Sequence, residues 1–251
     1  MGMRGLADKT AIVTGAAGGL GTATVKRLVE EGCNVAAADL HAAPLSELAA
    51  QFKGKVLDLP ADVRQPEECE RMVERAASHF GSVDLLVNNA AVINKHYPVA
   101  EMPVEEFDRV HSVNVRGVFL VLRATLRSMI AQGKGGAIVN ISSVAALRAN
   151  GGISPYGSAK RAVLGLSGAA ALENGRYGIR VNSVCPGPID TPMLRPAINN
   201  PPGELEGFFR HLAIPRAARP AEIAAFIAYL LSDDASYCTG GIYPVDGGLT
   251  I

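Results

Sequence analysis

The stretch Thr14-Gly15-Ala16-Ala17-Gly18-Gly19-Leu20-Gly21 decides how this chain folds. It follows a short apolar run rich in β-branched residues, 10–14, and opens into a helical pattern, 20–31. Glycines let the backbone turn sharply, and a helix start offers free N–H groups and a partial positive charge. This order of strand, turn and helix predicts a pyrophosphate site. A plain tight turn is the alternative, since the spacing is Gly-x-x-x-Gly-x-Gly rather than Gly-x-Gly-x-x-Gly.

Outward from the turn, short apolar segments alternate with longer helical patterns along the chain. Such alternation predicts an α/β fold: a Rossmann-like, doubly wound parallel sheet of about seven strands in a three-layer α/β/α arrangement. The expected strands are 10–14, 34–38, 55–59, 83–87, 137–141, 180–184 and 242–245. The expected helices are 20–31, 44–52, 66–80, 104–114, 118–132, 155–177 and 221–232.

Length and composition limit the classes of protein. The 251 residues, 48% hydrophobic and 19% charged, fit one domain spanning 1–251 with a sizeable core. Lys+Arg and Asp+Glu are both 24, so no basic field favours nucleic acid or an anionic membrane. No run of about 18 apolar residues would span a membrane, and the N-terminus lacks a signal core. We therefore expect a cytoplasmic protein.

The four cysteines carry no metal-binding or redox pattern. They are scattered, without a CxxC motif or a Cys/His cluster, so neither a metal site nor a disulfide is expected. Isolated cysteines of this kind are typical of buried, reduced thiols. The cysteines are Cys33, Cys69, Cys185 and Cys238.

Asp39 ends the second expected strand, 18 residues after Gly21. A carboxylate there can accept hydrogen bonds from both ribose hydroxyls of an adenosine. It would repel a 2′-phosphate about 4 Å away by roughly 4 kcal/mol at an effective dielectric constant near 20. No Arg or Lys stands in the glycine turn or just after Asp39, so the sequence favours NAD over NADP. An exposed strand-end Asp is the alternative.

Two further strand ends carry polar residues. Asp62-Val63 follows the third expected strand, where the carboxylate would meet an adenine amino group or belong to the start of the helix at Pro66. Asn88-Asn89-Ala90-Ala91 ends the fourth strand. Its small residues suit close approach to a ligand, and an ordinary strand-end turn explains them nearly as well.

Ser154 and Pro155 open the longest helical pattern, as a predicted N-cap and first helical residue. Tyr156 then lies in the first turn, with Lys160 four residues on and on the same face. The pKa of free tyrosine is about 10, and a neighbouring ammonium and a helix start both favour the phenolate. We therefore expect a lowered pKa that lets Tyr156 act as a base. An ordinary surface pair is the alternative.

Ser143 ends the fifth expected strand, where a hydroxyl can hydrogen-bond a substrate oxygen as charge develops. Taken alone, it also fits a strand-end turn. Together with Tyr156, Lys160, the glycine turn and Asp39, it predicts an enzyme that moves a hydride between a nicotinamide and a carbonyl or secondary alcohol carbon.

These residues together resemble the short-chain dehydrogenase/reductase family, in its common form of about 250 residues. The resemblance runs from Thr14 to the tail at 245–248. It implies a catalytic tetrad of Asn114, Ser143, Tyr156 and Lys160, in which Asn114 holds a water of a proton relay behind Lys160. From its position alone, Asn114 is a polar residue inside a helix.

The resemblance also implies the contacts with the cofactor NAD, including a segment at 186–191 that holds its carboxamide. These contacts are Gly15, Gly19, Leu20, Gly21, Asp39, Leu40, Asp62, Val63, Asn89, Ala90, Tyr156, Lys160, Pro186, Gly187, Ile189 and Thr191. The chain departs from the family pattern in having Leu20 for the frequent Ile, and Ala91 for the usual Gly. The extra methyl group of Ala91 is expected to narrow the site.

A long, proline-rich irregular stretch follows the sixth strand, and it predicts a substrate lid at about 186–219 rather than a disordered loop. The residues expected to shape the substrate pocket are Ile93, Asn94, His96, Ile153, Pro188, Met193 and Leu194. Of these, His96 is more typical of a loop surface. This lining suits a small cyclic or aliphatic alcohol or ketone, a steroid-like ring or a sugar-derived polyol.

The helix from Pro155 is apolar nearly all round, which predicts that its outer face is buried against another subunit. The family resemblance implies a homotetramer. Two rival functions stay open: an NADP-dependent 3-oxoacyl-type or other carbonyl reductase, and a non-catalytic sensor that binds NAD(H).

Overall fold

The computed structural model describes residues 2–194, 209–210 and 212–251. Its centre is a seven-stranded sheet in the order β3-β2-β1-β4-β5-β6-β7, in which all paired neighbours are parallel. This confirms the predicted Rossmann-like sheet. The strands are β1 (Thr10–Thr14), β2 (Asn34–Asp39), β3 (Val56–Pro60), β4 (Leu85–Asn88), β5 (Gly136–Ile141), β6 (Ile179–Pro186) and β7 (Ile242–Val245).

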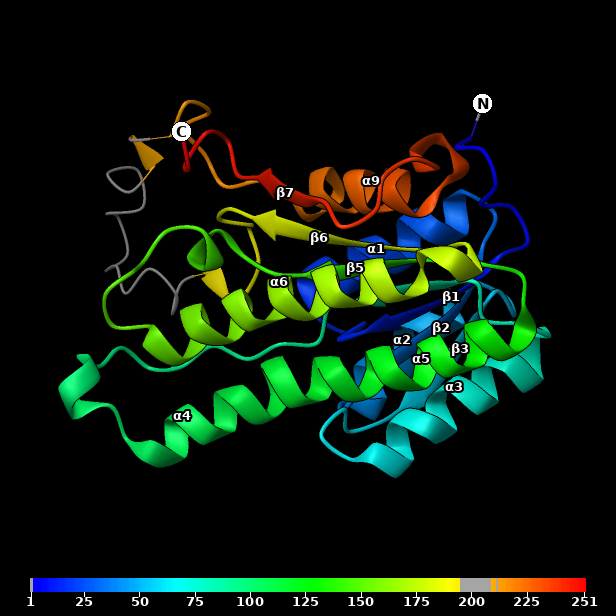
Figure 1. The fold of residues 1–251 in the computed structure, drawn as a ribbon, viewed down its shortest axis with the longest axis horizontal. Helices are drawn as coiled ribbons and strands as arrows, with labels where there is room; N and C mark the ends of the chain where they lie inside the picture. Colours follow the sequence, from blue (N-terminus) through cyan, green and yellow to red (C-terminus); the bar gives the residue numbers. More distant parts are fainter. Residues whose placement is uncertain (1, 195–208, 211) are drawn as a thin grey trace.

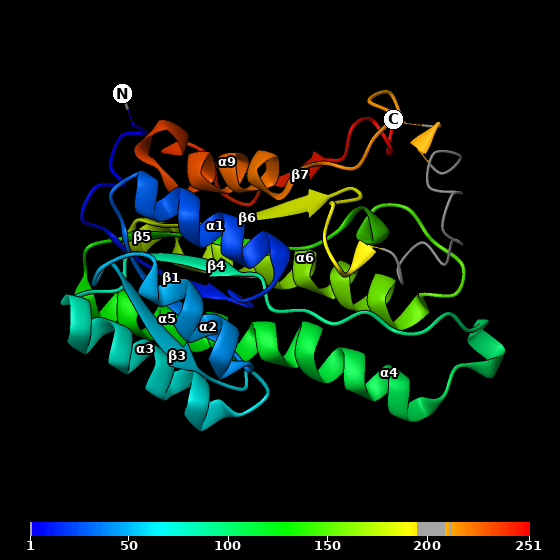
Figure 2. The same ribbon diagram turned by 180° about the vertical axis from the view of Figure 1, so that it is seen from behind.

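Helices cover both faces of the sheet and complete three layers (Figures 1 and 2). On one face α1 (Gly19–Glu30), α2 (Ala42–Ala50) and α9 (Pro220–Leu231) pack in a cluster with Ala11 and Val13 of β1. On the other face α3 (Pro66–Phe80), α5 (Val118–Gln132) and α6 (Ser154–Asn174) pack with Ile12. Successive strand residues point to opposite faces, so both sides of β1 are apolar and buried.

The strand order reverses next to β1, which pairs with β2 on one side and β4 on the other. Connections from the carboxyl ends of these two strands run in opposite directions, and ligands bind at such a switch point in open α/β sheets. The glycine turn follows β1, and the Asn88-Asn89 pair lies at the end of β4. The fold thus places the predicted site at the carboxyl ends of the central strands β1 and β4.

Element boundaries differ from prediction mainly around Asn114. The helix expected to end there does not end: α4 (Val104–His111) runs through a π-helical turn, Ser112–Gly117, directly into α5. Gly117 keeps a helical φ of −60° instead of breaking the chain. A π turn adds one residue per turn and recurs at functional sites, and here it places the side chain of Asn114 toward the loop after β4.

The predicted N-cap at Ser154 is wrong. The structure makes Ile153 the N-cap of α6, its carbonyl accepting the N–H of Gly157 at 2.9 Å, and Ser154 is already helical. The free amide of Tyr156 is taken instead by Oδ1 of Asn94, a residue of the loop after β4, at 3.3 Å. A partner from elsewhere in the fold replaces the local cap.

Part of the predicted lid is described. Its two ends meet, because Ala218 donates its N–H to the carbonyl of Pro188 at 2.8 Å and accepts the N–H of Asp190 at 2.9 Å. Residues 195–208 and 211 of the predicted lid lie outside the described residues.

All four cysteines are free thiols, with Cys33, Cys69 and Cys185 buried.

Within the described residues, no group of three or more His, Cys, Asp or Glu side chains could hold a metal ion. None of the described helices is long and apolar enough to cross a membrane.

Candidate active site

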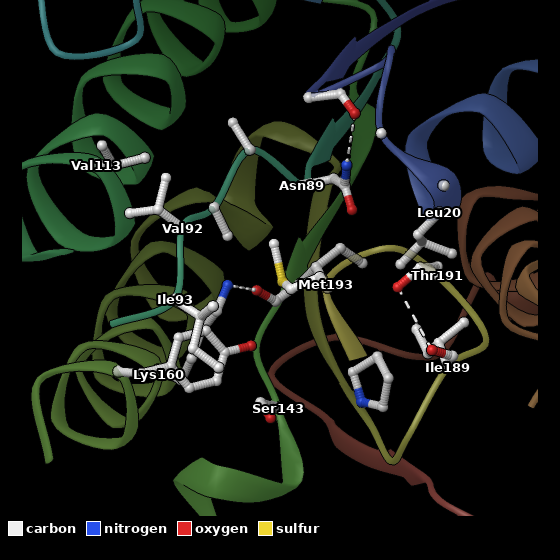
Figure 3. Close-up of a pocket in the computed structure, with 18 of the residues that line it drawn as sticks. Leu20, Asn89, Val92, Ile93, Val113, Ser143, Lys160, Ile189, Thr191 and Met193 are labelled. Atoms are coloured by element: carbon white, nitrogen blue, oxygen red, sulfur yellow. Dashed lines mark hydrogen bonds between the residues drawn. The ribbon is translucent and has the colours of Figure 1, made fainter. Parts of the chain in front are cut away.

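A cavity of about 1580 Å³ opens at the carboxyl ends of the strands (Figure 3). Every residue predicted to contact the cofactor lines it, and so does Ser143. The predicted pocket residues that line it are Ile93, His96, Ile153, Pro188, Met193 and Leu194. One expectation is wrong: Asn94 does not line the cavity and is buried. His96 is a half-buried loop residue that lines the cavity beside Gly152.

The glycine turn is tied to the end of β4. Asn89 donates from Nδ2 to the carbonyls of Thr14 and Gly15 at 2.9 and 3.1 Å, and Figure 3 shows one hydrogen bond of this side chain as a dashed line. The hydroxyl of Thr14 accepts the backbone N–H groups of Asn89 and Ala90 at 2.9 and 3.0 Å. A Cβ added at Gly21 would lie 2.0 Å from the carbonyl oxygen of Gly15, so only glycine fits there. These bonds fix the turn that the sequence predicted.

The start of α1 faces the cavity without a side-chain cap. Its N-cap is Gly18, no hydroxyl or carboxylate bonds the first turn, and that turn holds no acidic residue. Gly18, Gly19 and Leu20 line the cavity. Unpaired N–H groups and a partial positive charge at this point suit an anionic phosphate group.

Asp39 is half-buried at the end of β2, where its carboxylate borders the cavity. Oδ2 accepts the N–H of Ala17 and Oδ1 the N–H of His41, each at 3.0 Å. Two backbone amides therefore fix the orientation of this carboxylate beside the glycine turn. The unliganded strand-end alternative accounts less well for a carboxylate held in a cavity wall.

Asp62 also lines the cavity, but its carboxylate is occupied by Arg64 at 2.6 to 3.0 Å. The hydrogen bond with the Arg64 guanidinium, the largest effect, holds the pKa of Asp62 below its usual value. The N-cap of α3 is Gln65, so Asp62 is not the cap. An adenine amino group would share these oxygens with Arg64.

Three of the four catalytic candidates, Ser143, Tyr156 and Lys160, line the cavity, and Figure 3 labels Ser143 and Lys160 among its residues. Lys160 is buried, 2% exposed, and Nζ donates to the carbonyl of Ile141 at 2.8 Å. The same Nζ lies 5.7 Å from the ring centroid of Tyr156. Ser143 lies just after β5, and its Oγ accepts the N–H of Ala145 at 3.1 Å. The structure thus brings Ser143, Tyr156 and Lys160 together.

Burial controls the ionisation of this pair. It lowers the pKa of Lys160 to about 8. It also raises the pKa of Tyr156 above its usual value, and the hydrogen bond with Ser143 offsets this only in part. The expectation of a lowered pKa for Tyr156 is therefore wrong for the chain by itself, because burial is the largest effect and raises this pKa.

Asn114 is buried in the π-helical turn and does not line the cavity. Its side chain pairs with the backbone of Val92, accepting the N–H at 2.9 Å and donating to the carbonyl at 2.8 Å. Val92 itself lines the cavity, and Figure 3 shows it between Val113 and Ile93. Asn114 thus anchors the loop after β4.

Three residues of the site were missed or misplaced from sequence. Thr14 could have been found, because a hydroxyl directly before a glycine turn often bonds backbone groups. Asn94 and Arg109 gave no local signal. Arg109 lines the cavity and donates to the carbonyl of Ile93 at 2.8 Å, 16 residues away.

Comparison with known proteins agrees with this geometry. A family model described as enoyl-(acyl carrier protein) reductase matches residues 15–250. The chain is 39% identical to levodione reductase of Leifsonia aquatica, covering 96% of this chain and 94% of the relative. It is equally identical to 2,5-dichloro-2,5-cyclohexadiene-1,4-diol dehydrogenase of Sphingobium indicum, covering 99% of both chains.

Solved structures show the same fold. The crystal structure of levodione reductase superposes with a TM-score of 0.92 at 38% identity, over 97% of this chain and 98% of that one. NAD+-bound xylitol dehydrogenase superposes with a TM-score of 0.93 at 32% identity, over 98% of this chain and all of the other. The chain therefore belongs to the short-chain dehydrogenase/reductase family, as an oxidoreductase that acts on alcohol and ketone groups.

Proposed function

We propose that this protein is an NAD-dependent dehydrogenase/reductase that interconverts a secondary alcohol and a ketone. The observation that carries the proposal is one cavity whose walls hold both a dinucleotide-type glycine turn and the Ser143, Tyr156 and Lys160 cluster. When bound, NAD supplies the hydride carrier and, in its oxidised form, a positive charge.

The residues present fit this cofactor. The uncapped start of α1 offers N–H groups to the pyrophosphate, and the Asp39 carboxylate accepts hydrogen bonds from the adenosine ribose. The other residues proposed to hold the cofactor are Gly15, Gly19, Leu20, Gly21, Leu40, Asp62, Val63, Asn89, Ala90, Pro186, Gly187, Ile189 and Thr191, all in the cavity wall. The similarity to NAD+-bound xylitol dehydrogenase supports the choice of NAD.

Tyr156 is proposed to move the proton of the reaction. In alcohol oxidation its phenolate oxygen takes the hydroxyl proton, and in ketone reduction its hydroxyl returns it. Ser143 donates a hydrogen bond that orients the substrate oxygen, and Lys160 supplies positive charge that favours the phenolate. Because burial raises the pKa of Tyr156, that positive charge is needed for the phenolate to form near neutral pH.

Asn114 is proposed to support the proton path behind Lys160 by holding the backbone of Val92 in place. The described part of the 186–219 segment is proposed to serve as the substrate lid, since Pro188, Met193 and Leu194 already line the cavity.

The proposed substrate is a small alcohol or ketone, cyclic or aliphatic, since Ile93, Ile153 and Met193 give the pocket a mostly apolar wall. The name of the dichlorocyclohexadienediol dehydrogenase supports a six-membered ring as one candidate. We place the protein in the cytoplasm as a single domain. A homotetramer is proposed, supported by Leu172 of α6 and Phe119 of α5, which are exposed apolar side chains.

Turnover with a panel of cyclic, aliphatic, steroid and polyol alcohols and NAD, and with the ketones and NADH, tests the proposal. We expect oxidation or reduction of at least one member, and a fall in kcat of about 10³-fold in Tyr156→Phe at unchanged NADH affinity. If the wild type and the variant both bind NADH and are equally inert, the protein is a sensor and the proposal is wrong.

A further inference from the structure

Asn94 is a buried polar residue of the loop after β4 that does not line the cavity and contacts the start of α6. Its side chain is 1% exposed and makes three hydrogen bonds. Oδ1 accepts the backbone N–H of Tyr156 at 3.3 Å, and Nδ2 donates to the carbonyls of Lys95 at 2.7 Å and Gly152 at 3.0 Å. The Asn94 side chain therefore bonds the backbone at three points: Tyr156 in α6, Gly152 in the segment before α6, and Lys95 in its own loop.

The bond to Tyr156 takes the place of a helix cap. The first amides of a helix have no intrahelical partner, and a nearby side-chain oxygen normally satisfies one of them. α6 has no side-chain cap from its own N-cap residue. Oδ1 of Asn94 accepts the N–H of Tyr156, the residue whose phenol is proposed to move the proton. This hydrogen bond therefore helps fix the position of the Tyr156 backbone at the start of α6.

The loop that carries Asn94 is itself held to α4. Arg109 donates to the carbonyl of Ile93 at 2.8 Å and to Glu106 at 2.8 and 2.9 Å. Glu106 in turn accepts the N–H of Lys95 at 3.0 Å. The Arg109 guanidinium, as the largest effect, lowers the pKa of Glu106 to about 2, so Glu106 remains a carboxylate at working pH. The residues on both sides of Asn94 are thereby fixed.

A second bond joins the same segments. The N–H of Tyr97 donates to the carbonyl of Gly152 at 3.1 Å, the oxygen that also accepts from Asn94. Gly152 has a φ of +80°, and a Cβ there would lie 2.7 Å from the His96 ring. The 92–97 loop and the segment before α6 therefore pack closely enough that a shift of one moves the other.

We infer that Asn94 is a positioning residue for the reaction. It joins the 92–97 loop, held by Glu106 and Arg109, to the backbone of Tyr156 and so sets the position of the phenol. The inference rests on the proposed function, since it assigns Asn94 its role through Tyr156. An error of about 1 Å in a reacting group can cost about 10²-fold in rate.

Two variants and a matched control test the role. Asn94→Leu keeps the volume and removes all three bonds, while Asn94→Asp keeps the oxygen facing Tyr156 and adds a negative charge. The control is Asn182→Leu: Asn182 is also 1% exposed, accepts the N–H of Gly241 at 3.1 Å and donates to the carbonyl of Cys238 at 2.7 Å, away from the cavity. Rates are expressed per NADH-binding site, so that unfolded protein does not count.

For Asn94→Leu we expect kcat to fall about 30- to 100-fold with NADH affinity within about threefold. Asn94→Asp should recover at least a third of the loss, and the midpoint of its kcat–pH profile should move to higher pH because a carboxylate opposes the phenolate. Asn182→Leu should lower the melting temperature and keep kcat per site.

Each other result overturns the inference. If Asn94→Leu keeps the wild-type kcat and pH profile, or loses no more kcat per site than Asn182→Leu, Asn94 is only structural and the proposed function stands. If Asn94→Asp is no better than Asn94→Leu and its pH midpoint is unchanged, the oxygen facing Tyr156 is irrelevant. A wild type that turns over nothing in the panel overturns the proposed function itself and, with it, this role.

Discussion

The two ends of the cavity differ in how their charges are held. At the glycine-turn end, the carboxylates of Asp39 and Asp62 are half-buried and already satisfied by partners close in sequence. At the other end, Lys160 is buried against one carbonyl oxygen, and burial lowers its pKa, with the Cys185 thiol as the smaller, opposing effect. The carboxylates at the glycine-turn end are therefore paired with hydrogen-bond donors of the protein itself, whereas the Lys160 amine at the other end has no carboxylate partner among the described residues.

The difference follows from what each end has to do. A binding end gains from charges that are oriented beforehand, because little reorganisation is then needed when a ligand arrives. A catalytic end needs groups that change ionisation during the reaction, and burial of Tyr156 and Lys160 brings both closer to their neutral forms. We therefore expect substitutions at the catalytic end to affect rate most, and those at the other end to affect affinity.

Lys160→Met should give the largest effect. The substitution keeps an unbranched chain and removes the positive charge beside Tyr156, so the phenolate loses its supporting cation. We expect kcat to fall about 10³-fold, with a much smaller change at the glycine-turn end. Steady-state rates over a range of pH check this. A variant that retains a tenth of the wild-type kcat would mean that Lys160 does not act on Tyr156.

The same variant should be more stable than the wild type. The folded pKa of Lys160, about 8, lies below its usual 10.5, so below pH 8 the buried ammonium costs about 3 kcal/mol. From about pH 8 upward the unfolded chain binds more protons, so the free energy of unfolding rises with pH in the wild type. Lys160→Met should lose that rise. Thermal unfolding from pH 6 to 10 measures it, and identical pH dependence in both proteins would contradict it.

Gly21→Ala should have the next largest effect. A Cβ there would lie 2.0 Å from the carbonyl oxygen of Gly15, so the turn has to move. Overpacking of this kind costs several kcal/mol, and we expect the Kd for NADH to rise at least about 10²-fold. Gly18→Ala is the matched control, because its Cβ would lie 3.3 Å from the same oxygen and should cost less than about fivefold. Fluorescence titration with NADH compares the two, and an unchanged Kd in Gly21→Ala would show that the turn is not the cofactor site.

The comparison also shows how far the sequence predicts the site. The glycine turn and Asp39 were predictable because the elements that position them, β1, α1 and β2, all lie between Thr10 and Asp39. The cap of α6 was not, since the rule that pointed to Ser154 is local and the oxygen that reaches Tyr156 comes from Asn94, 62 residues away.

The same reason explains two further errors. The ionisation of Tyr156 was predicted from its helical neighbours, whereas burial by the whole fold decides the direction of the pKa change. The helix was expected to end at Asn114, whereas the π-helical turn that continues it lets the Asn114 side chain bond Val92, a tertiary contact invisible to periodicity. The parallel sheet itself was predictable, because apolar strands alternating with helices leave few other arrangements.

Asp39→Asn should change the choice of cofactor. The amide keeps an oxygen for the N–H of Ala17 or His41 and removes the negative charge. Asp39 would repel a 2′-phosphate about 4 Å away by roughly 4 kcal/mol, and solvent screening reduces this repulsion. We therefore expect the ratio of NADPH affinity to NADH affinity to rise about 10- to 100-fold in the variant. If the wild type already prefers NADPH, or if the ratio is unchanged in the variant, the assignment of NAD is wrong.

Arg64→Gln should have the smallest effect. It tests whether the ion pair between Arg64 and Asp62 is needed to bind the cofactor at the glycine-turn end. The Arg64 side chain is 43% exposed, and an exposed ion pair contributes about 1 kcal/mol or less. Without the guanidinium, the pKa of Asp62 should return toward its usual value, and its carboxylate becomes free to meet an adenine amino group. These effects oppose each other, so we expect the Kd for NADH to change less than about threefold. A loss above tenfold would place the guanidinium itself on the cofactor, and the contact proposed for Asp62 would then belong to Arg64.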